Sequence, residues 1–231
     1  MRVHRRCEAY RTDDVPADIS VEITQADIER ERSCSIDAYG QEDRISGDSS
    51  DNALEELAVY RKIAERMPSF DTILMHGSCI AADGEGYLFT AKSGTGKSTH
   101  TRLWREMLGE RAVIVNDDKP LIRITETGVT AFGTPWDGKH RLSTNCAVPL
   151  KAICILERAE KNVIRRVSPV EAYPLLLQQI YRPQDPASMS RTLTLIDRLI
   201  GRVDLWRLGC NMEPEAAQIS YHTMRGNEER T

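Results

Sequence analysis

The feature that most constrains the fold is a glycine-rich stretch at residues 91–99, which reads AKSGTGKST. A short apolar and aromatic run at residues 86–90 precedes it, and residues 97–108 carry apolar side chains at helical spacing. A strand that leads through a small-residue loop into a helix leaves backbone N–H groups aimed at one point, where the helix dipole adds positive potential. The order of these parts therefore predicts a phosphate-binding loop between a buried strand and a helix.

The side chains of this loop fit the binding of a nucleotide with magnesium. Lys97 is expected to reach the β- and γ-phosphates, and the Ser98 hydroxyl to hold Mg²⁺. Ala91 stands where the motif G-x-x-x-x-G-K-[ST] has its first glycine, but the two later glycines remain, so we expect the loop to close. A chance Ser/Gly loop is the alternative, and the ordered strand, loop, lysine, hydroxyl and helix disfavour it. The predicted cofactors are ATP and Mg²⁺, and the predicted ATP-binding residues are Ser93, Gly94, Thr95, Gly96, Lys97, Ser98 and Thr99.

Two adjacent carboxylates follow the next buried strand. The apolar run at residues 113–115 ends in Asn116, Asp117 and Asp118. Carboxylates at the end of a strand, one connection beyond a phosphate loop, are placed to meet a metal held at Ser98. Phosphoryl transfer needs a metal to bridge phosphate oxygens and a carboxylate to orient the acceptor hydroxyl or take its proton. We therefore predict that the two aspartates divide these tasks; taken alone, the pair is also typical of a solvated turn.

Composition excludes several other classes of protein. The 231 residues carry a net charge of −4, so no excess of positive charge indicates a nucleic-acid partner. No apolar run approaches the ~18 residues of a membrane span, and none follows the basic N-terminus, so neither a membrane partner nor a signal peptide is expected. The 6 cysteines are scattered without a C-x-x-C pair, which fits a reducing cytoplasm. Whether the chain forms a homo-oligomer is left open.

The pattern of elements predicts an α/β protein with a mixed sheet and flanking helices. A small N-terminal β/α segment, residues 1–50, is expected to pack on one larger unit, residues 51–231. In the first segment, we expect a strand at 17–23, a capped helix from Thr24 and a polar loop at 39–51. In the second, helices are expected at 52–67, 97–108, 168–180, 193–203 and 213–224, and strands at 72–75, 79–82, 86–90, 112–115, 121–125, 129–132, 150–156, 162–167 and 205–208.

The order of these motifs resembles the catalytic domain of bacterial HPr kinase/phosphorylase. The likeness covers about residues 72–125: a Met-His-Gly triplet at 75–77, the glycine-rich loop, and the aspartate pair. That family shares its fold with phosphoenolpyruvate carboxykinase, so the resemblance implies a P-loop core of this type.

The same resemblance implies roles for single residues. It places His76 near the phosphates, makes Lys97 and Ser98 ligands of ATP and Mg²⁺, and makes one aspartate the catalytic base. By this likeness we favour Asp117 as the base and Asp118 as the metal-side carboxylate. Taken without the family, His76 is more often a structural histidine, and even with the family the two interpretations are balanced.

The chain departs from that family in ways that affect the acceptor. Thr99 stands where the family has glutamate, and the downstream signature that serves HPr binding and phosphorolysis is missing. Protein serines, peptide hydroxyls and small molecules therefore all remain candidate acceptors. In place of the signature, residues 132–141 form an irregular stretch. There Trp136 is expected to shape the acceptor pocket and Lys139 or Arg141 to neutralise transition-state charge; a surface turn with the tryptophan packed inward is the alternative. Arg182 is a weaker candidate for the γ-phosphate, against an ordinary helix-end cation.

These inferences predict an ATP-dependent kinase that transfers the γ-phosphate to an acceptor hydroxyl. Two alternatives remain open. The first is an enzyme like phosphoenolpyruvate carboxykinase, for which this chain is short and holds only 5 histidines for a separate metal site. The second is a sensor or scaffold that binds ATP without transferring phosphate.

Overall fold

A long central strand organises the structure, a computed structural model that describes residues 2–13, 15–33, 50–138 and 140–226. Over these residues the strands form one 9-stranded sheet with the order β1-β5-β6-β7-β3-β2-β4, while β9 pairs with β7 and β8 pairs with β9. The strands are β1 (Thr72–Leu74), β2 (Ser78–Ala82), β3 (Glu85–Thr90), β4 (Ala112–Asn116), β5 (Leu121–Ile124), β6 (Val129–Phe132), β7 (Ala147–Arg158), β8 (Val163–Arg166) and β9 (Asp204–Cys210).

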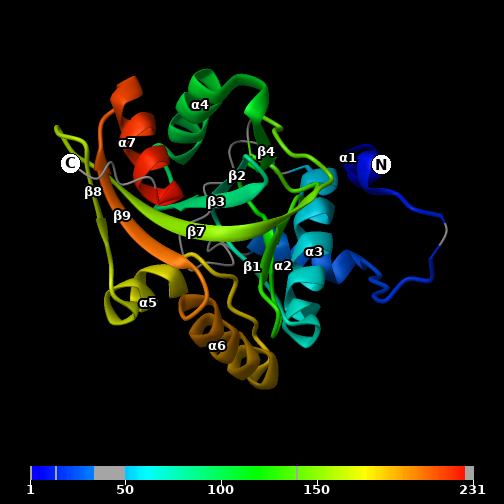
Figure 1. Ribbon diagram of the computed structural model, residues 1–231. Coiled ribbons are helices and arrows are strands. Elements are labelled where there is room, and N and C mark those ends of the chain that lie inside the picture. Colours follow the sequence, from blue (N-terminus) through cyan, green and yellow to red (C-terminus); the bar gives the residue numbers. More distant parts are fainter. Residues whose placement is uncertain (1, 14, 34–49, 139, 227–231) are drawn as a thin grey trace.

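Strand β7 belongs to an antiparallel and a parallel part of this sheet. Its first residues pair antiparallel with β6. Its later residues pair parallel with both β3 and β9. The curved course of β7 between these partners is visible in Figure 1. This double use explains why the strand runs beyond residues 150–156, the range that its apolar side chains predict.

Helices cover both faces of the parallel part. Helices α4 (Lys97–Leu108) and α7 (Pro214–Arg225) lie on one face, and α5 (Pro169–Leu177) and α6 (Pro186–Ile200) on the other (Figure 1). The period of two in β7 produces this division: Ala152, Cys154 and Leu156 pack in the cluster with α4 and α7. Ile153 and Ile155 pack in the cluster with α5 and α6.

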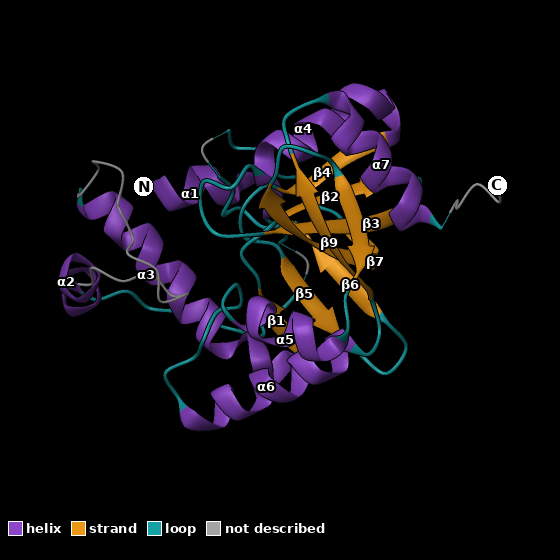
Figure 2. Ribbon diagram, turned by 90° about the vertical axis from the view of Figure 1, so that its left-hand side faces the viewer, coloured by secondary structure: helices purple, strands orange, loops and turns teal. Residues whose placement is uncertain are grey.

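The N-terminal helices lie at one side of the sheet, as Figure 2 shows. They are α1 (Arg2–Cys7), the short 3-10 helix η1 (Glu8–Tyr10), α2 (Gln25–Ser33) and α3 (Asp51–Arg66), and a second 3-10 helix, η2 (Met67–Phe70), leads into β1. Helix α3 packs through Tyr60 and Ala64 against Leu74 and Tyr181. Another 3-10 helix, η3 (Gly109–Arg111), joins α4 to β4.

The strand expected at residues 17–23 is wrong, because this segment is irregular. Its carbonyl oxygens are bound by side chains of α3 instead of a neighbouring strand: Lys62 donates to Glu22 and Arg66 to Ser20. The capped start of α2 is confirmed by reciprocal hydrogen bonds between Thr24 and Asp27. Most of the expected loop at 39–51 lies outside the described residues.

From residue 50 onward, the expected strands and helices are confirmed, with ends displaced by a few residues. The largest difference is α6, which starts at Pro186 behind the side-chain cap of Asp185. None of the helices in the described ranges is long and apolar enough to cross a bilayer. The expected α/β class with a mixed sheet and flanking helices is confirmed.

Candidate functional site

The glycine-rich loop connects β3 to the first turn of α4. Two of its glycines have left-handed backbone angles, with φ 77° at Gly94 and 122° at Gly96. Side chains with a Cβ rarely adopt these angles, so both positions require glycine. Gly96 is the N-terminal cap of α4 and supplies no side-chain cap, so the first N–H groups of the helix have no capping side chain. Such groups favour an anion at this end of the helix.

Lys97 lies folded back over this loop. Its side chain is largely buried, with 8% of the residue exposed, and Nζ donates to the carbonyl oxygen of Ala91 at 3.0 Å. Burial lowers the pKa of Lys97 to about 8, although the carboxylates of Asp118 and Asp117 act in the opposite direction. The charges of both aspartates therefore act on this ammonium group.

A buried asparagine shapes the turn that carries the two aspartates. Asn116 ends β4, and its Oδ1 accepts the backbone N–H groups of Asp118 at 2.8 Å and Lys119 at 2.6 Å. Its Nδ2 donates to both oxygens of Thr134 at 3.0 Å. The amide of Asn116 thus uses its donors and acceptor to hold the turn against the segment that follows β6.

Asp117 points into the protein and is 4% exposed. The Ser78 hydroxyl donates to its Oδ1 at 2.7 Å, whereas Oδ2 is buried and has no hydrogen-bond partner among the described residues. Burial raises the pKa of Asp117, and the nearby hydroxyls of Ser78 and Ser98 partly offset this effect. Asp117 and Ser98 are therefore together, and one carboxylate oxygen is left for a further ligand.

Asp118 points the other way, towards His76 and the partly exposed ammonium group of Lys119. Its Oδ1 lies 3.5 Å from Nε2 of His76, and its Oδ2 lies 3.2 Å from Nζ of Lys119. Nδ1 of His76 is 3.1 Å from Oε1 of Gln179. Burial lowers the pKa of His76 to about 4, and the ammonium groups of Lys97 and Lys119 contribute to this. His76 is consequently neutral near pH 7.

The segment after β6 lies against the aspartates. A Cβ at Gly133 would lie 1.8 Å from the carbonyl oxygen of Thr144, so only glycine fits there. A Cβ at Gly138 would lie 3.6 Å from Oδ2 of Asp117, which places this part of the loop over the buried carboxylate. The Ser143 hydroxyl donates to Asp137 at 3.0 Å within the same loop.

The predicted acceptor-loop residues differ in where they lie. Trp136 packs against Tyr60 of α3, with ring centroids 5.7 Å apart. Lys139 lies outside the described residues. Arg141 is exposed and has a left-handed φ of 50°. Arg182 is half-buried and makes no hydrogen bond or ion pair with a described residue. For the described side chains of Trp136, Arg141 and Arg182, the structure shows no hydrogen bond, ion pair or ring contact with the glycine-rich loop.

A cavity of about 470 Å³ opens on the other side of that loop. It lies at the carboxyl ends of the parallel strands β3 and β7, which is a common ligand position in α/β sheets. Its lining includes Lys92, Glu157, Arg158, Leu175, Gln178 and Gln179. Its volume is within the roughly 300–1,000 Å³ of small-molecule sites.

Several of these positions were missed by sequence reasoning. Ser78, Thr134 and Gln179 contact the site from distant parts of the chain, and no local motif marks them. Arg158, whose guanidinium donates to the carbonyl oxygen of Gly94, reads as an ordinary charge at a strand end. Asn116 is the exception, because an asparagine directly before two aspartates at a strand end is typical of a side-chain-stabilised turn.

The arrangement fits a magnesium nucleotide. Among the described residues no three His, Cys, Asp or Glu side chains are placed to hold a metal ion, but Mg²⁺ is usually held by one or two carboxylates together with substrate phosphates. The unpartnered Oδ2 of Asp117 and the adjacent Ser98 hydroxyl are a donor set of that kind. An anion fits the uncapped start of α4 next to them.

Comparisons with known proteins give a family and a weak structural likeness. The profile of a family described as "SynChlorMet cassette protein ScmC" matches residues 48–181. No curated protein matches the sequence. Among solved structures, the Hpr(Ser) kinase/phosphatase from Coxiella burnetii is similar with a TM-score of 0.39 and 11% identity, over 67% of this chain and 95% of that chain. The expected resemblance to HPr kinase is therefore found only as a distant likeness between the two structures, and this likeness gives no information about activity. Because the family match spans more than half of the 231 residues, this protein belongs to the ScmC family of SynChlorMet cassette proteins.

Proposed function

We propose that this protein is an ATP-dependent kinase that transfers the γ-phosphate of ATP to an acceptor hydroxyl with the help of Mg²⁺. The observation that carries the proposal is the convergence of three features on one point. They are the uncapped start of α4, the buried ammonium group of Lys97, and the carboxylate of Asp117 with its unpartnered oxygen. A structural turn would leave a buried carboxylate oxygen unsatisfied at a cost of about 1–3 kcal/mol or more, so a ligand is the better explanation.

Each residue of the site has a task in this reaction. The loop N–H groups and Lys97 would bind the phosphates, with Lys97 exchanging its bond to Ala91 for a phosphate oxygen. Ser98 and a carboxylate would hold Mg²⁺, which supplies neutralisation of phosphate charge when bound. The acceptor oxygen forms a bond to the γ-phosphorus while the bond to the β–γ bridging oxygen breaks, and the acceptor proton passes to the remaining carboxylate.

The contacts favour a division of labour between the aspartates that is the reverse of the one implied by family likeness. Asp117 lies near Ser98, the predicted Mg²⁺ ligand, and its side chain is buried. Asp118 is more exposed and lies beside neutral His76. We therefore propose Asp117 as the metal-side carboxylate and Asp118 as the base that receives the acceptor proton.

The cavity beside the loop is the proposed position for the nucleoside. Asp117 and Asp118 follow β4, whereas the cavity lies at the end of β7 on the opposite side of β3. Phosphates bound at the loop between them would direct the nucleoside to one side and the transferring group to the other. The acceptor would then approach at Asp118, beneath the segment around Gly138.

Nucleotide binding is the first test of this proposal. Titration calorimetry with Mg·ATP should give binding to the wild type and loss of most affinity in Lys97→Ala, because the lysine contacts the ligand. Lys151→Ala is the control, since Lys151 is a partly buried lysine that pairs with Glu85, at the opposite end of β3 from the loop. Unchanged ATP binding in folded Lys97→Ala would contradict the loop assignment.

Transfer is the second test, because it separates a kinase from an ATP sensor. Asp118→Asn keeps the shape of the side chain but removes the base, so it should bind ATP and lose roughly 10²–10⁴-fold in transfer rate. Asp117→Asn should instead weaken the dependence on Mg²⁺. Mass spectrometry would detect a gain of ~80 Da on peptide, protein or metabolite pools. Wild type that binds ATP, changes shape and phosphorylates none of these pools would favour the sensor.

A further inference from the structure

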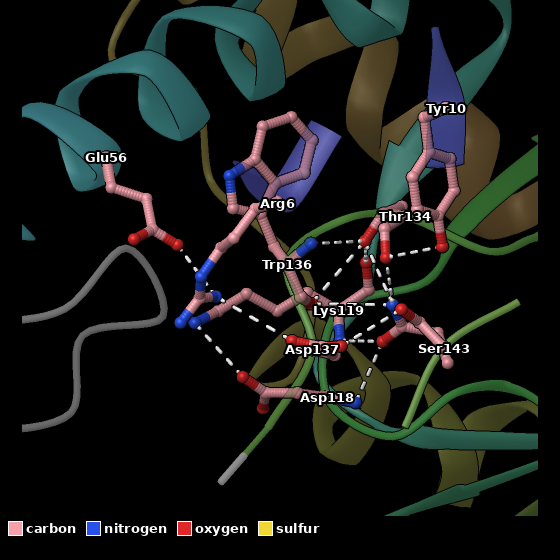
Figure 3. A network of polar contacts seen from close by, with 10 residues as sticks. Arg6, Tyr10, Glu56, Asp118, Lys119, Thr134, Trp136, Asp137 and Ser143 are labelled. Atoms are coloured by element: carbon pink, nitrogen blue, oxygen red, sulfur yellow. Dashed lines mark hydrogen bonds and ion pairs between the residues drawn. The ribbon is translucent and has the colours of Figure 1, made fainter. Parts of the chain in front are cut away.

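Lys119 follows the aspartate pair and has its backbone fixed at both ends. Its N–H donates to Asn116 at 2.6 Å, and its carbonyl oxygen accepts the Thr134 hydroxyl at 2.9 Å. Figure 3 shows the Lys119 side chain extending from this anchored turn towards Asp118. Because these two hydrogen bonds fix the backbone of Lys119, its side chain begins at a fixed Cα position, and this restricts where its ammonium group can lie.

The ammonium group of Lys119 lies between a carboxylate and an aromatic ring. Nζ is 3.2 Å from Oδ2 of Asp118 and 5.1 Å from the ring centroid of Tyr60. The side chain is 24% exposed, so its charge is partly shielded from water and acts over a longer range than a surface charge. The Tyr60 ring attracts the cation and limits its movement.

The charges of Lys119 and Lys97 both act on His76. Nζ of Lys119 and Nε2 of His76 lie 3.2 Å and 3.5 Å from the two carboxylate oxygens of Asp118, and both ammonium groups lower the pKa of His76. Two ammonium groups therefore accompany the two aspartates. When the carboxylates bind Mg²⁺ or the acceptor hydroxyl, the ammonium groups can neutralise the negative charge of a phosphate instead.

We infer that Lys119 is a second phosphate-binding lysine, which contacts the terminal phosphoryl group of a bound nucleoside triphosphate beside Asp118. This inference rests on the proposed function. Lys97 binds the phosphates that lie at the glycine-rich loop. Lys119 lies beside Asp118, away from the loop, so it contacts only the terminal phosphoryl group of a triphosphate. The protein would thus distinguish a triphosphate from a diphosphate through a residue outside the loop.

The test compares the binding of Mg·ADP with that of its imido-bridged triphosphate analogue, Mg·AMP-PNP. In Lys119→Met, affinity for AMP-PNP should fall roughly tenfold to hundredfold, which is the range for one charge-assisted hydrogen bond, while affinity for ADP stays within about twofold. Lys119→Arg should restore most of the loss, because it keeps the charge. Lys151→Met is the control: the Lys151 side chain is 26% exposed and ion-paired with Glu85, and it should change neither affinity.

A second measurement needs no variant. Brief acetylation of wild-type protein, followed by mass spectrometry, should modify Lys119 several-fold less with AMP-PNP than with ADP, and Lys151 equally in both. Two results together would overturn the inference and leave the proposed function standing. In the first, Lys119→Met loses affinity equally for AMP-PNP and ADP, or for neither. In the second, Lys119 is acetylated equally with either nucleotide. Wild type that binds neither nucleotide would overturn both the inference and the proposed function.

Discussion

The connections that leave β3 and β4 meet at one site but are built in different ways. The loop after β3 is held largely by its own residues: the Thr95 N–H donates to Lys92, and the Lys97 ammonium group to Ala91. The turn after β4 is held by residues far along the chain, with Asn116 bound to Thr134 and Asp117 bound to Ser78. A local motif makes the first connection, and the tertiary fold makes the second.

This difference predicts where substitutions should damage the fold and where they should damage only binding. The loop after β3 has left-handed glycines with no atom near the position that a Cβ would take, whereas the segment packed on the β4 turn has a glycine without space for one. Substitutions at the turn after β4 should therefore lower the free energy of unfolding strongly, as substitutions in a protein core do. Substitutions in the glycine-rich loop should lower it little, as surface substitutions do.

The largest expected effect is a matched pair of glycine substitutions. Gly133→Ala places a Cβ 1.8 Å from a carbonyl oxygen of Thr144 and 2.7 Å from that of Val115, and backbone atoms cannot move aside. We expect a loss of more than about 4 kcal/mol, or no folded protein. Gly94→Ala meets no atom within 4 Å and has only its φ of 77° to oppose it, so it should cost about 1–2 kcal/mol. Urea unfolding measures both, and equal losses would break the comparison.

Asn116→Ala is expected to have the next largest effect. It removes the groups that bind Thr134 and the N–H groups of Asp118 and Lys119, and it leaves these partners partly buried. The free energy of unfolding should fall by roughly 2–4 kcal/mol. The control is Asn145→Ala, because Asn145 is exposed and makes one bond to Ala9; it should cost less than about 1 kcal/mol.

The same contrast explains what could be predicted from the sequence. The loop after β3 can be predicted down to single residues, because its glycines, lysine and hydroxyl are adjacent in the chain. The aspartates can be found for a similar reason, since they follow an apolar run. Their opposite directions follow from the local turn at Asn116. Their surroundings come from distant residues: Ser78 of β2 bonds Asp117, and Gln179, which follows α5, bonds His76 beside Asp118. No local spacing could place these partners.

The strand expected at residues 17–23 illustrates the same limit. Its alternation is suitable for a strand, yet Lys62 and Arg66 of α3 bind the carbonyl oxygens that a neighbouring strand would use. Alternation predicts which side chains share a face, but a strand also needs a partner for its backbone. That partner is set by the tertiary structure.

The third prediction concerns acid and the helix that follows the glycine-rich loop. His100 of α4 is buried, with Nε2 3.0 Å from the Ser220 hydroxyl, and burial lowers its pKa to about 4 from 6.5. As the pH falls below about 6.5 the unfolded chain gains a proton that folded His100 does not, so stability decreases towards pH 4, by up to about 3 kcal/mol. His100→Gln should flatten this part of the stability curve, whereas exposed His222→Gln should leave it unchanged. An unaltered curve in His100→Gln would assign the acid response to other groups.

The smallest expected effect tests whether the glycine-rich loop is as self-contained as the comparison requires. Arg158 at the end of β7 is exposed and donates to the carbonyl oxygen of Gly94, so it is a contact to the loop from a distant residue. If the loop is held mainly by its own bonds, Arg158→Ala should lower the free energy of unfolding by about 1 kcal/mol or less, as expected for an exposed charged hydrogen bond. In Arg158→Ala, the rate of hydrogen exchange at the Thr95 N–H, which donates to Lys92 at 3.2 Å, should rise at most several-fold. Arg158→Lys should change both quantities as little as Arg158→Ala does. A loss above about 2 kcal/mol would mean that β7 holds this loop in the way that Ser78 and Thr134 hold the aspartate turn, and the two connections would then not differ in kind.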